Sequence, residues 1–514
     1  MKNKTSPVLW NSIARDLLKK EMNSKNLSIE ELCNRLENIG IKETKASISN
    51  KLSRGSFSAK FFLQAFHAIG GDTIHLPTEI LDQIAKVNRS LIKEPSDFHG
   101  GDSVIWEGVD LFAYNSFENE WYVDTSKYRR RKSEKAGKVV SLFSGAGGLD
   151  LGLEKAGFET VACVEFDSDC KETLRKNRPE WPIVEGENNG DIRKVSVSEI
   201  LQKSELKPGD ATLVVGGAPC QPFSNIGKRE GVGDEKNGGD LFQEFVRVVS
   251  GVLPKAFIFE NVVGITQQKH TEVLRYMQSC FSGLGYGLTY RIMNAADYGV
   301  PQKRKRFILM GLRHGITPAL PQPTNYKSAE TYKEFCLQVG KRPKNKFPLW
   351  QTVNDAFSKI TTKDLKSSNN VVMNISEKVR NRMELIGPGE NFHVLPMDMR
   401  PNCWKSGKHQ GQDTFGRLRL DEPSVTIRTA AYNPTKGRYI HPTENRGLNT
   451  IELAVLQGFP SNWKFCSARY EKVKLTTAGK QIGNAVPIQF AEALGKALHI
   501  QLQAIDELGL KKCV

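Results

Sequence analysis

Cys220 lies in a short stretch whose residue types favour a presented nucleophile. The apolar, strand-like residues 212–215 are followed at 216–224 by the sequence GGAPCQPFS, in which glycine, proline and serine end the strand. A cysteine in a tight loop after a buried strand is held in place at the mouth of that strand, and its thiolate is a strong nucleophile. The alternative for a lone cysteine is a buried structural thiol.

A glycine-rich turn and two acidic positions suggest a binding site for a nucleotide-like ligand. Residues 143–152 (FSGAGGLDLG) lie between a strand-like stretch and a helical pattern, an arrangement that lets backbone approach a ligand closely. Glu165 ends the next strand-like stretch, where it is placed to bind ribose hydroxyls, and Phe166 could stack on an adenine. Asp191, in a later loop, could bind an exocyclic amine. Solvated loop carboxylates are the alternative for each acid.

The sequence pattern divides the chain into five segments. Residues 138–310 alternate strand-like, glycine-rich and helical stretches, which predicts an α/β core with a parallel sheet. Residues 1–80 resemble short helices separated by glycine, and residues 81–137 resemble a linker that ends in a basic run. Residues 311–465 are irregular and basic, and residues 466–514 end in a helical pattern.

Composition favours a polyanionic partner. The 514 residues carry a formal charge of +16, and residues 311–420 alone hold 18 Lys/Arg against 9 Asp/Glu. No apolar stretch is long enough to span a membrane, and the first residues do not form a signal-peptide core. The nine cysteines include no C-x-x-C pair and no zinc spacing, which predicts reduced thiols in a cytoplasm and no structural metal.

Five motifs in a fixed order resemble those of the DNA (cytosine-5)-methyltransferases. They are FSGAGGLDLG at 143–152, PCQ at 219–221, ENV at 260–262, QKRKR at 302–306 and QIGNAVP at 481–487. The resemblance covers about residues 138–310 and 415–500. It implies a Rossmann-like methyltransferase sheet with helices on both faces, a small irregular target-recognition domain, and S-adenosylmethionine as cofactor. The first loop lacks G-x-G-x-x-G spacing, so a nicotinamide enzyme is disfavoured.

The resemblance implies covalent catalysis on cytosine. Cys220 would add to C6 of the base, so that C5 becomes nucleophilic enough to accept a methyl group. Glu260 would meet N3 as a proton donor, while Arg306, and less directly Arg304, would stabilise charge at O2. Because C5 is buried in a duplex, the base must be flipped into the pocket. The alternative for Glu260 is a structural acid at the edge of the core that is hydrogen-bonded by its neighbours. The alternative for residues 302–306 is a basic strand exposed to solvent.

The resemblance also assigns residues to two ligands. Those expected at S-adenosylmethionine are Phe143, Ser144, Gly145, Gly147, Gly148, Glu165, Phe166, Asp191, Ile192, Pro219, Leu241 and Asn484. Double-stranded DNA is the implied macromolecular partner, bound by a monomer, and basic side chains suit its phosphates. Those expected at DNA in this part of the chain are Gln221, Ser224, Lys405, Lys408, Arg417 and Arg419.

Residues 1–80 lie outside the resemblance and predict an all-α domain. A capping box, SIEE at 28–31, precedes a helix predicted to end near residue 39, and a second helix is predicted over about 43–53. The pair resembles a helix-turn-helix unit that could let the enzyme bind its own promoter, with candidate DNA contacts at Lys45, Asn50 and Arg54. A small helical packing module is the alternative, since the segment holds 12 basic against 8 acidic residues.

Two other functions remain compatible with the sequence. One branch with similar motifs methylates tRNA, and a DNA-binding regulator could retain an inactive methyltransferase fold. The long recognition region and the candidate helix-turn-helix unit argue against RNA. An inactive protein is disfavoured by the intact set Cys220, Glu260, Arg304, Arg306 and Asn484. The expected function is therefore DNA methylation, either within a restriction-modification system or by a solitary enzyme.

Overall fold

The computed structural model divides the chain into two compact units, residues 1–98 and 99–514. No helix in the described part of the chain is long and apolar enough to cross a membrane. The structure describes residues 15, 18–19, 22–23, 25, 27–38, 41–54, 61, 65, 68–69, 112–115, 120–128, 135–187, 189–218, 240–266, 271–368, 370–405 and 413–507.

The N-terminal unit contains the predicted pair of helices, α2 (Ile29–Asn38) and α3 (Lys45–Arg54). Leu32 and Leu36 on α2 share a small core with Ile48 and Leu52 on α3, because each pair lies one helical turn apart. At the start of α2 the Glu31 amide donates to the Ser28 hydroxyl at 3.1 Å, as the capping pattern predicts.

A seven-stranded sheet forms the centre of the second unit, with strands in the order β5-β4-β3-β6-β7-β9-β8. The first five are parallel, whereas β9 is antiparallel to both of its neighbours. The strands are β3 (Gly137–Leu142), β4 (Phe158–Val164), β5 (Ile183–Val184), β6 (Leu213–Gly216), β7 (Ala256–Val262), β8 (Tyr286–Asn294) and β9 (Lys305–Arg313).

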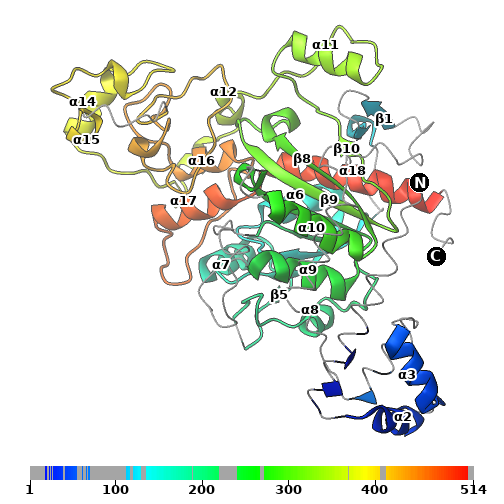
Figure 1. Ribbon diagram of the computed structural model, residues 1–514. Helices are drawn as coiled ribbons and strands as arrows, with labels where there is room; N and C mark the ends of the chain where they lie inside the picture. The colour runs from blue at the N-terminus through cyan, green and yellow to red at the C-terminus, as the bar shows by residue number, and fades with distance from the viewer. Residues whose placement is uncertain are drawn as a thin grey trace. The chain divides into compact units, whose positions relative to one another are not determined.

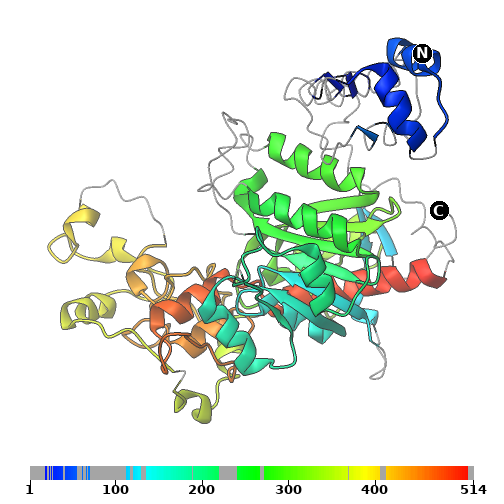
Figure 2. The same cartoon turned by 90° about the horizontal axis from the view of Figure 1, so that it is seen from below.

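Helices cover both faces of this sheet, as predicted (Figures 1 and 2). Along β6, Leu213 and Val215 face a core formed with α6 and α18, while Val214 faces a core formed with α8, α9 and α10. This alternation follows from the two-residue period of a strand. The helices are α6 (Gly148–Ala156), α8 (Val197–Lys203), α9 (Asp240–Val252), α10 (Thr271–Gly283) and α18 (Ile488–Glu507).

The last helix of the chain packs closely on the first helix after the glycine loop. A Cβ atom at Gly152 on α6 would lie 2.4 Å from the Cβ of Ala491 on α18, so only glycine permits this approach. From the other side, Gly495 on α18 faces Leu153 and Ala156 on α6. The C-terminal segment therefore returns to the start of the large sheet in the second unit (residues 99–514), which is called the catalytic unit below.

The segment expected to be a linker differs from that expectation. β1 (Phe112–Asn115) and β2 (Glu120–Val123) pair with each other, and β2 pairs in parallel with β10 (Leu320–Pro321). Tyr122 and Val123 are buried in the same core as α18. The strand β2 contains three consecutive aromatic and β-branched residues, Trp121, Tyr122 and Val123, a composition that favours a strand packed on a core.

The segment predicted to form a target-recognition region (residues 311–465, called the recognition region below) starts within regular structure, because residues 311–321 complete β9 and form β10. Beyond them, a separate small core gathers Met383, Phe392, Trp404 and Phe415. Most of this region is loop, and α14 and α15 lie apart from the large sheet (Figure 1). Its helices are α11 (Ala329–Gln338), α12 (Val353–Phe357), α13 (Thr362–Leu365), α14 (Glu377–Glu384) and α15 (Asn402–Lys405), and α16 (Thr450–Leu456) and α17 (Leu475–Asn484) follow.

Candidate active site

The carboxyl ends of the parallel strands border a cavity of about 830 Å³. Open α/β sheets bind their ligands at this edge. The cavity walls come from the loop after β3, the ends of β4 and β7, and the end of α17. The described residues predicted for catalysis or for the cofactor all line it, except Gly147, which caps the start of α6. The cavity thus brings together segments more than three hundred residues apart in sequence.

The loop after β3 folds sharply around one end of this cavity. Phe143 adopts a left-handed backbone conformation with φ of 55°, and α6 begins at Gly148. Inside the turn, the Gly145 amide donates to Oε2 of Glu165 at 2.6 Å. The glycine loop is therefore tied to the end of the neighbouring strand β4 through a side chain.

Glu165 is a buried acid with two backbone partners. Its other oxygen, Oε1, accepts from the Asp167 amide at 2.7 Å. Burial raises the pKa of Glu165, while the hydrogen bonds from Asp167 and Gly145 oppose that shift. Each carboxylate oxygen can accept one more hydrogen bond, which leaves capacity for two hydroxyl groups in the cavity. Beside it Phe166 leaves 60% of its surface exposed, unusual for a phenylalanine and suited to stacking.

A tight turn brings Asp191 and Ile192 to the same cavity. Asn189 and Gly190 have φ of 55° and 78°, and a Cβ atom at Gly190 would lie 2.2 Å from the carbonyl oxygen of Glu165. The turn can therefore press against the end of β4 only with glycine at this position.

Two cations hold this turn in place. Lys171 on α7 (Ser168–Asn177) is buried, donates to the carbonyl oxygen of Asn189 at 3.3 Å and pairs with Glu185 at 2.9 Å. Arg193 pairs with Asp191 at 2.7 Å, and its hydrogen bond holds the pKa of that carboxyl below the usual range. The burial of Lys171 could not be predicted from sequence, because a lysine on an amphipathic helix usually points to solvent.

Glu260 and Arg306 meet across neighbouring strands at the far side of the cavity. Nε of Arg306 lies 2.9 Å from Oε1 of Glu260, and both side chains are mostly buried. Glu260 lies near the end of β7 and Arg306 at the start of antiparallel β9, so the two strand ends coincide. The ion pair fixes the direction of both planar groups, which leaves their remaining oxygen and nitrogen atoms for a ligand in the cavity.

The predicted nucleophile lies outside the described residues, as do Pro219, Gln221 and Ser224. The described chain runs up to Ala218, which lines the cavity together with Gly217. Nδ2 of Asn261 donates to the carbonyl oxygen of Ala218 at 3.3 Å, so the residue after Glu260 holds the chain that leads into this loop.

Arg304 takes a different place from the one expected of a cytosine contact. Its side chain is buried, and its two terminal nitrogens donate to the carbonyl oxygens of Ile427 and Gly483, each at 2.9 Å. Burial, and secondarily the charge of Arg306, lowers the pKa of Arg304 to about 9. Since these donors are already used, Arg306 is the better candidate for the O2 contact, and Arg304 holds the backbone around the cavity.

Gln302 and Gln457 form a second bridge between the same segments. The Gln302 amide nitrogen donates to Oε1 of Gln457 at 2.7 Å, and its oxygen accepts from the Ile427 amide at 3.0 Å. Gln457 in turn donates to the carbonyl oxygen of Ala485. Both glutamines are fully buried. Gln457 was missed from sequence, because a glutamine at the end of a helix carries no signal of burial.

Comparison with known proteins identifies the family of this catalytic unit. The sequence model of the C-5 cytosine-specific DNA methylases matches residues 137–499. The chain belongs to this family. The chain is 32% identical over 411 residues to the type II methyltransferase M.Sau96I of Staphylococcus aureus, covering 77% of this chain and 84% of that one. It is also 32% identical over 398 residues to M.Eco47II of Escherichia coli, with 76% and 84% coverage.

A solved structure supports the same fold for this methylase. A putative DNA modification methyltransferase encoded in an E. coli prophage aligns with a TM-score of 0.51 and 24% identity, covering 71% of this chain and 99% of that chain. At the N-terminus, residues 10–74 match a domain of unknown function, DUF6471.

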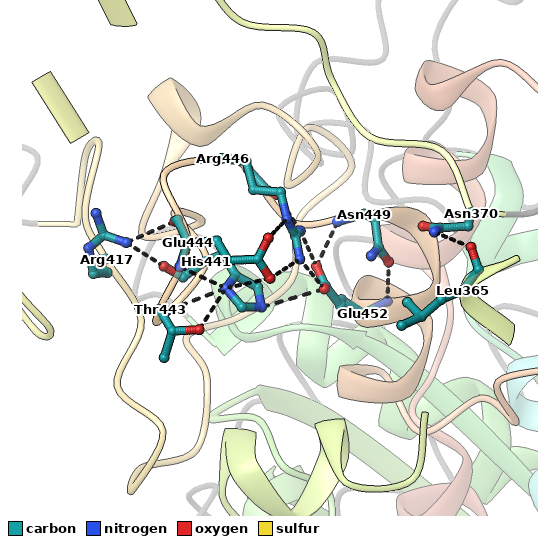
Figure 3. Close-up of polar contacts among 10 residues, drawn as sticks. Leu365, Asn370, Arg417, His441, Thr443, Glu444, Arg446, Asn449 and Glu452 are labelled. Carbon is teal, nitrogen blue, oxygen red and sulfur yellow. Dashed lines mark hydrogen bonds and ion pairs between the residues drawn. The ribbon is translucent and has the colours of Figure 1, made fainter. Parts of the chain in front are cut away.

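In the recognition region of the methylase, Arg417 is not available for the expected phosphate contact. Arg417 is buried and donates to the carbonyl oxygens of Met383, Ile386, His441 and Glu444 and to the side chain of Asn445. Figure 3 shows it beside a network in which Arg446 pairs with both Glu444 and Glu452. In a region with little regular structure, a buried arginine can satisfy many orphaned carbonyl groups at once.

The other predicted DNA contacts in this region are exposed or lie outside the described residues. Lys405 is exposed at the end of α15, whereas Lys408 lies outside the described residues. Arg419 is half exposed and pairs with Asp421 at 2.7 Å. In the N-terminal unit, Lys45 pairs with Glu30 at 2.7 Å and Asn50 is exposed. The side chain of Arg54 lies outside the described part of the structure.

The different places of Arg304 and Arg306 lead to a prediction. Arg304→Met should lower the free energy of unfolding by about 2–4 kcal/mol, because two buried carbonyl groups lose their donors. Arg306→Lys keeps a positive charge beside Glu260, so it should leave the unfolding free energy nearly unchanged. It should nevertheless slow turnover sharply, because an ammonium group lacks the directed donors of the guanidinium. Urea unfolding and single-turnover methylation distinguish the two. Equal destabilisation by both substitutions would show that the two arginines do not have separate roles.

Proposed function

We propose that this methylase transfers a methyl group from S-adenosylmethionine to C5 of a cytosine flipped out of double-stranded DNA, through a covalent bond between Cys220 and C6. The observation that carries the proposal is the shared cavity. It is lined by the Glu260–Arg306 pair, by the candidate cofactor residues, and by Ala218, two residues before Cys220. The names of the type II relatives support a role in restriction-modification.

Cys220 would make the ring reactive. Addition of its thiolate to C6 breaks the C5–C6 double bond and turns the ring into an enamine with electron density at C5. S-adenosylmethionine, when bound, supplies the methyl group that C5 receives. Loss of the C5 proton and departure of the Cys220 thiolate then restore the double bond, so the enzyme is regenerated without a redox partner.

Glu260 and Arg306 would share the charge that this addition produces. A carboxyl group near the end of β7 can donate or share a proton at N3, and the guanidinium beside it can donate to O2. The ion pair between them at 2.9 Å supports this division, since it aims both groups at neighbouring positions in the cavity. A buried, prearranged pair also avoids solvent reorganisation during the reaction.

The donor set of the cavity fits S-adenosylmethionine. Glu165 retains acceptor capacity for ribose hydroxyls, Phe166 offers an exposed ring to adenine, and Asp191 offers a carboxylate to its amine. The turn at 143–148, Leu241 and Asn484 complete the wall, with Pro219 assigned to it by family resemblance. A cavity of about 830 Å³ can hold this cofactor together with one base.

The direct test of the proposed activity is bisulfite sequencing of DNA from cells that express the protein. Protected cytosines within one recurring sequence would establish both the product and the recognition site. Protection confined to RNA, detected by bisulfite treatment of tRNA, would contradict the proposal. No protection in either nucleic acid would favour a non-catalytic role.

The nucleophile can be tested by substitution and trapping. Cys220→Ser should abolish turnover while S-adenosylhomocysteine still binds, because an alcohol ionises too rarely to add at C6. Cys280→Ser, at a half-buried cysteine on α10, is the matched control and should remain active. On a duplex with 5-fluorocytosine at the target, wild-type protein should form an adduct that survives denaturing electrophoresis. An adduct formed equally by Cys220→Ser would exclude Cys220 as the nucleophile.

The proposed proton donor, Glu260, can be tested by separating its effect on the rate of methyl transfer from its effect on binding. Glu260→Gln should slow methyl transfer by roughly two to four decades while DNA and cofactor affinities are retained, the usual contribution of a positioned acid. Glu159→Gln, at an exposed position on β4, should behave like wild type. Single-turnover rates and binding titrations separate the two effects. If the whole loss fell on DNA affinity, the role at N3 would be wrong.

We further propose that the N-terminal unit is an accessory DNA-binding module, with the DNA upstream of its own gene as target. Two short helices that pack on each other through a shared core, with exposed polar residues on α3, support this proposal. Its core is separate from the cores of the catalytic unit, which supports independent folding.

A truncated chain tests this module. Residues 99–514 should methylate DNA at a rate similar to the full chain, but should bind the upstream fragment at least tenfold more weakly in a mobility-shift assay. Within the full chain, Asn50→Ala on α3 should weaken that binding, while Asn38→Ala on α2 should not. Equal affinity of the full and truncated chains for the fragment would leave the unit as a packing module.

A further inference from the structure

A second, smaller cavity lies in the recognition half of the catalytic unit. Its volume is about 250 Å³. It is lined by Lys303, Asp413, Val425, Thr426, Arg428, Gly437, Arg438 and Tyr439. The lining therefore comes from four separate stretches of chain: Lys303 before β9, Asp413, residues 425–428 and residues 437–439.

The charge of this cavity is positive. Lys303, Arg428 and Arg438 face a single acid, Asp413. Arg438 pairs with Asp413 at 3.2 Å and donates to the carbonyl oxygen of Glu390 at 3.1 Å, so its guanidinium is fixed in place. Lys303 pairs at 3.0 Å with Glu422, on a half-exposed surface where such a pair is weak.

Arg428 differs from the other two cations. Its side chain is exposed, and no described residue accepts a hydrogen bond from its guanidinium or pairs with it. Two other lining residues, Thr426 and Tyr439, are held together, because the Tyr439 hydroxyl donates to the carbonyl oxygen of Thr426 at 2.8 Å and the tyrosine is buried. A guanidinium without an ion-pair partner among the described residues, at the lining of a positively charged cavity, is suited to bind an oxyanion.

The cavity adjoins the proposed reaction site. Gly483 lines the large cavity, and a Cβ atom there would lie 2.4 Å from the backbone carbon of Arg428. Lys303 immediately precedes Arg304, whose side chain bridges to Gly483. The backbone of Arg428 thus contacts the wall of the large cavity while its side chain lines the small one.

We infer that this cavity binds a backbone phosphate of the DNA next to the flipped cytosine, with Arg428 as its principal ligand. This inference rests on the proposed function, because a flipped base stays joined to its two flanking phosphates, which must then lie near the rim of the reaction cavity. Free phosphate has the same chemistry, but it lacks the base that would hold it at this position. The bound phosphate would hold the distorted backbone while the base occupies the large cavity.

The salt dependence of DNA binding tests the charge. Arg428→Gln should weaken binding to the mapped recognition duplex about tenfold and reduce the log–log salt slope by about one. Lys207→Gln, at an exposed lysine near the end of α8, removes one charge elsewhere and is the matched control. Affinity for S-adenosylhomocysteine should be unchanged in both variants. An unchanged salt slope in Arg428→Gln would overturn the assignment.

Neutral phosphate analogues test the position. Duplexes with one methylphosphonate at each backbone position around the target should show one site, adjacent to the target cytosine, whose neutralisation weakens wild-type binding. The same analogue should cause no further loss in Arg428→Gln, since the contact is already absent. Additive losses at every position would overturn the assignment. Inorganic phosphate at millimolar concentration should inhibit DNA binding by wild-type protein and by Arg428→Gln to the same extent, because the site needs a phosphate that is tethered to the flipped base. If phosphate inhibited only the wild-type protein, the cavity would be a site for free phosphate.

These outcomes are distinguishable from failure of the proposed function. If wild-type protein methylates DNA but Arg428→Gln retains its full salt slope, only the phosphate site is wrong. If wild-type protein methylates no DNA, the proposed function is wrong, and the phosphate site is overturned with it because it requires a flipped cytosine in DNA.

Discussion

The buried guanidinium of Arg304 is the constraint on which the geometry of the catalytic unit depends. It occupies the point where the start of β9, the segment returning from the recognition region and the end of α17 come together. A charge is costly to bury, and here it is stabilised by two carbonyl oxygens at 2.9 Å. Gln302 and Gln457 join the same three segments by neutral hydrogen bonds. Two parallel bridges therefore couple the region assigned to DNA with the wall assigned to the cofactor.

This coupling explains why neighbouring polar residues of the motif at 302–306 have different roles. On an antiparallel strand, successive side chains point to opposite faces, and the stretch before β9 continues that alternation. Lys303 and Arg306 reach two different cavities, while Gln302 and Arg304 are buried between them. One short segment thus contributes to the reaction site, to the interior hydrogen-bond network and to the cationic cavity.

Much of the catalytic unit could be predicted from sequence, since its motifs follow strands whose apolar runs are unambiguous. Glu165, Asp191, Glu260 and Arg306 meet in one cavity because the ends of neighbouring strands meet at one edge of a sheet. The roles of Arg304 and Arg417 could not be predicted, because charge alone does not reveal whether an arginine binds phosphate or backbone carbonyls. The same limit applies to Lys171, whose burial depends on a turn formed by residues 189–190. In loops, the partners of a side chain are set by tertiary contacts that no local pattern encodes.

The packing of α18 against α6 has a consequence for biosynthesis. The glycine loop is translated early, yet its helix is completed by contacts with residues 491 and 495, near the end of the chain. Asn484 and the carbonyl group of Gly483 also come late. A nascent chain that still lacks residues 483–495 has neither this helix packing nor that wall of the cavity. The cavity is therefore completed late in synthesis, because its first wall waits for segments more than three hundred residues further along the chain.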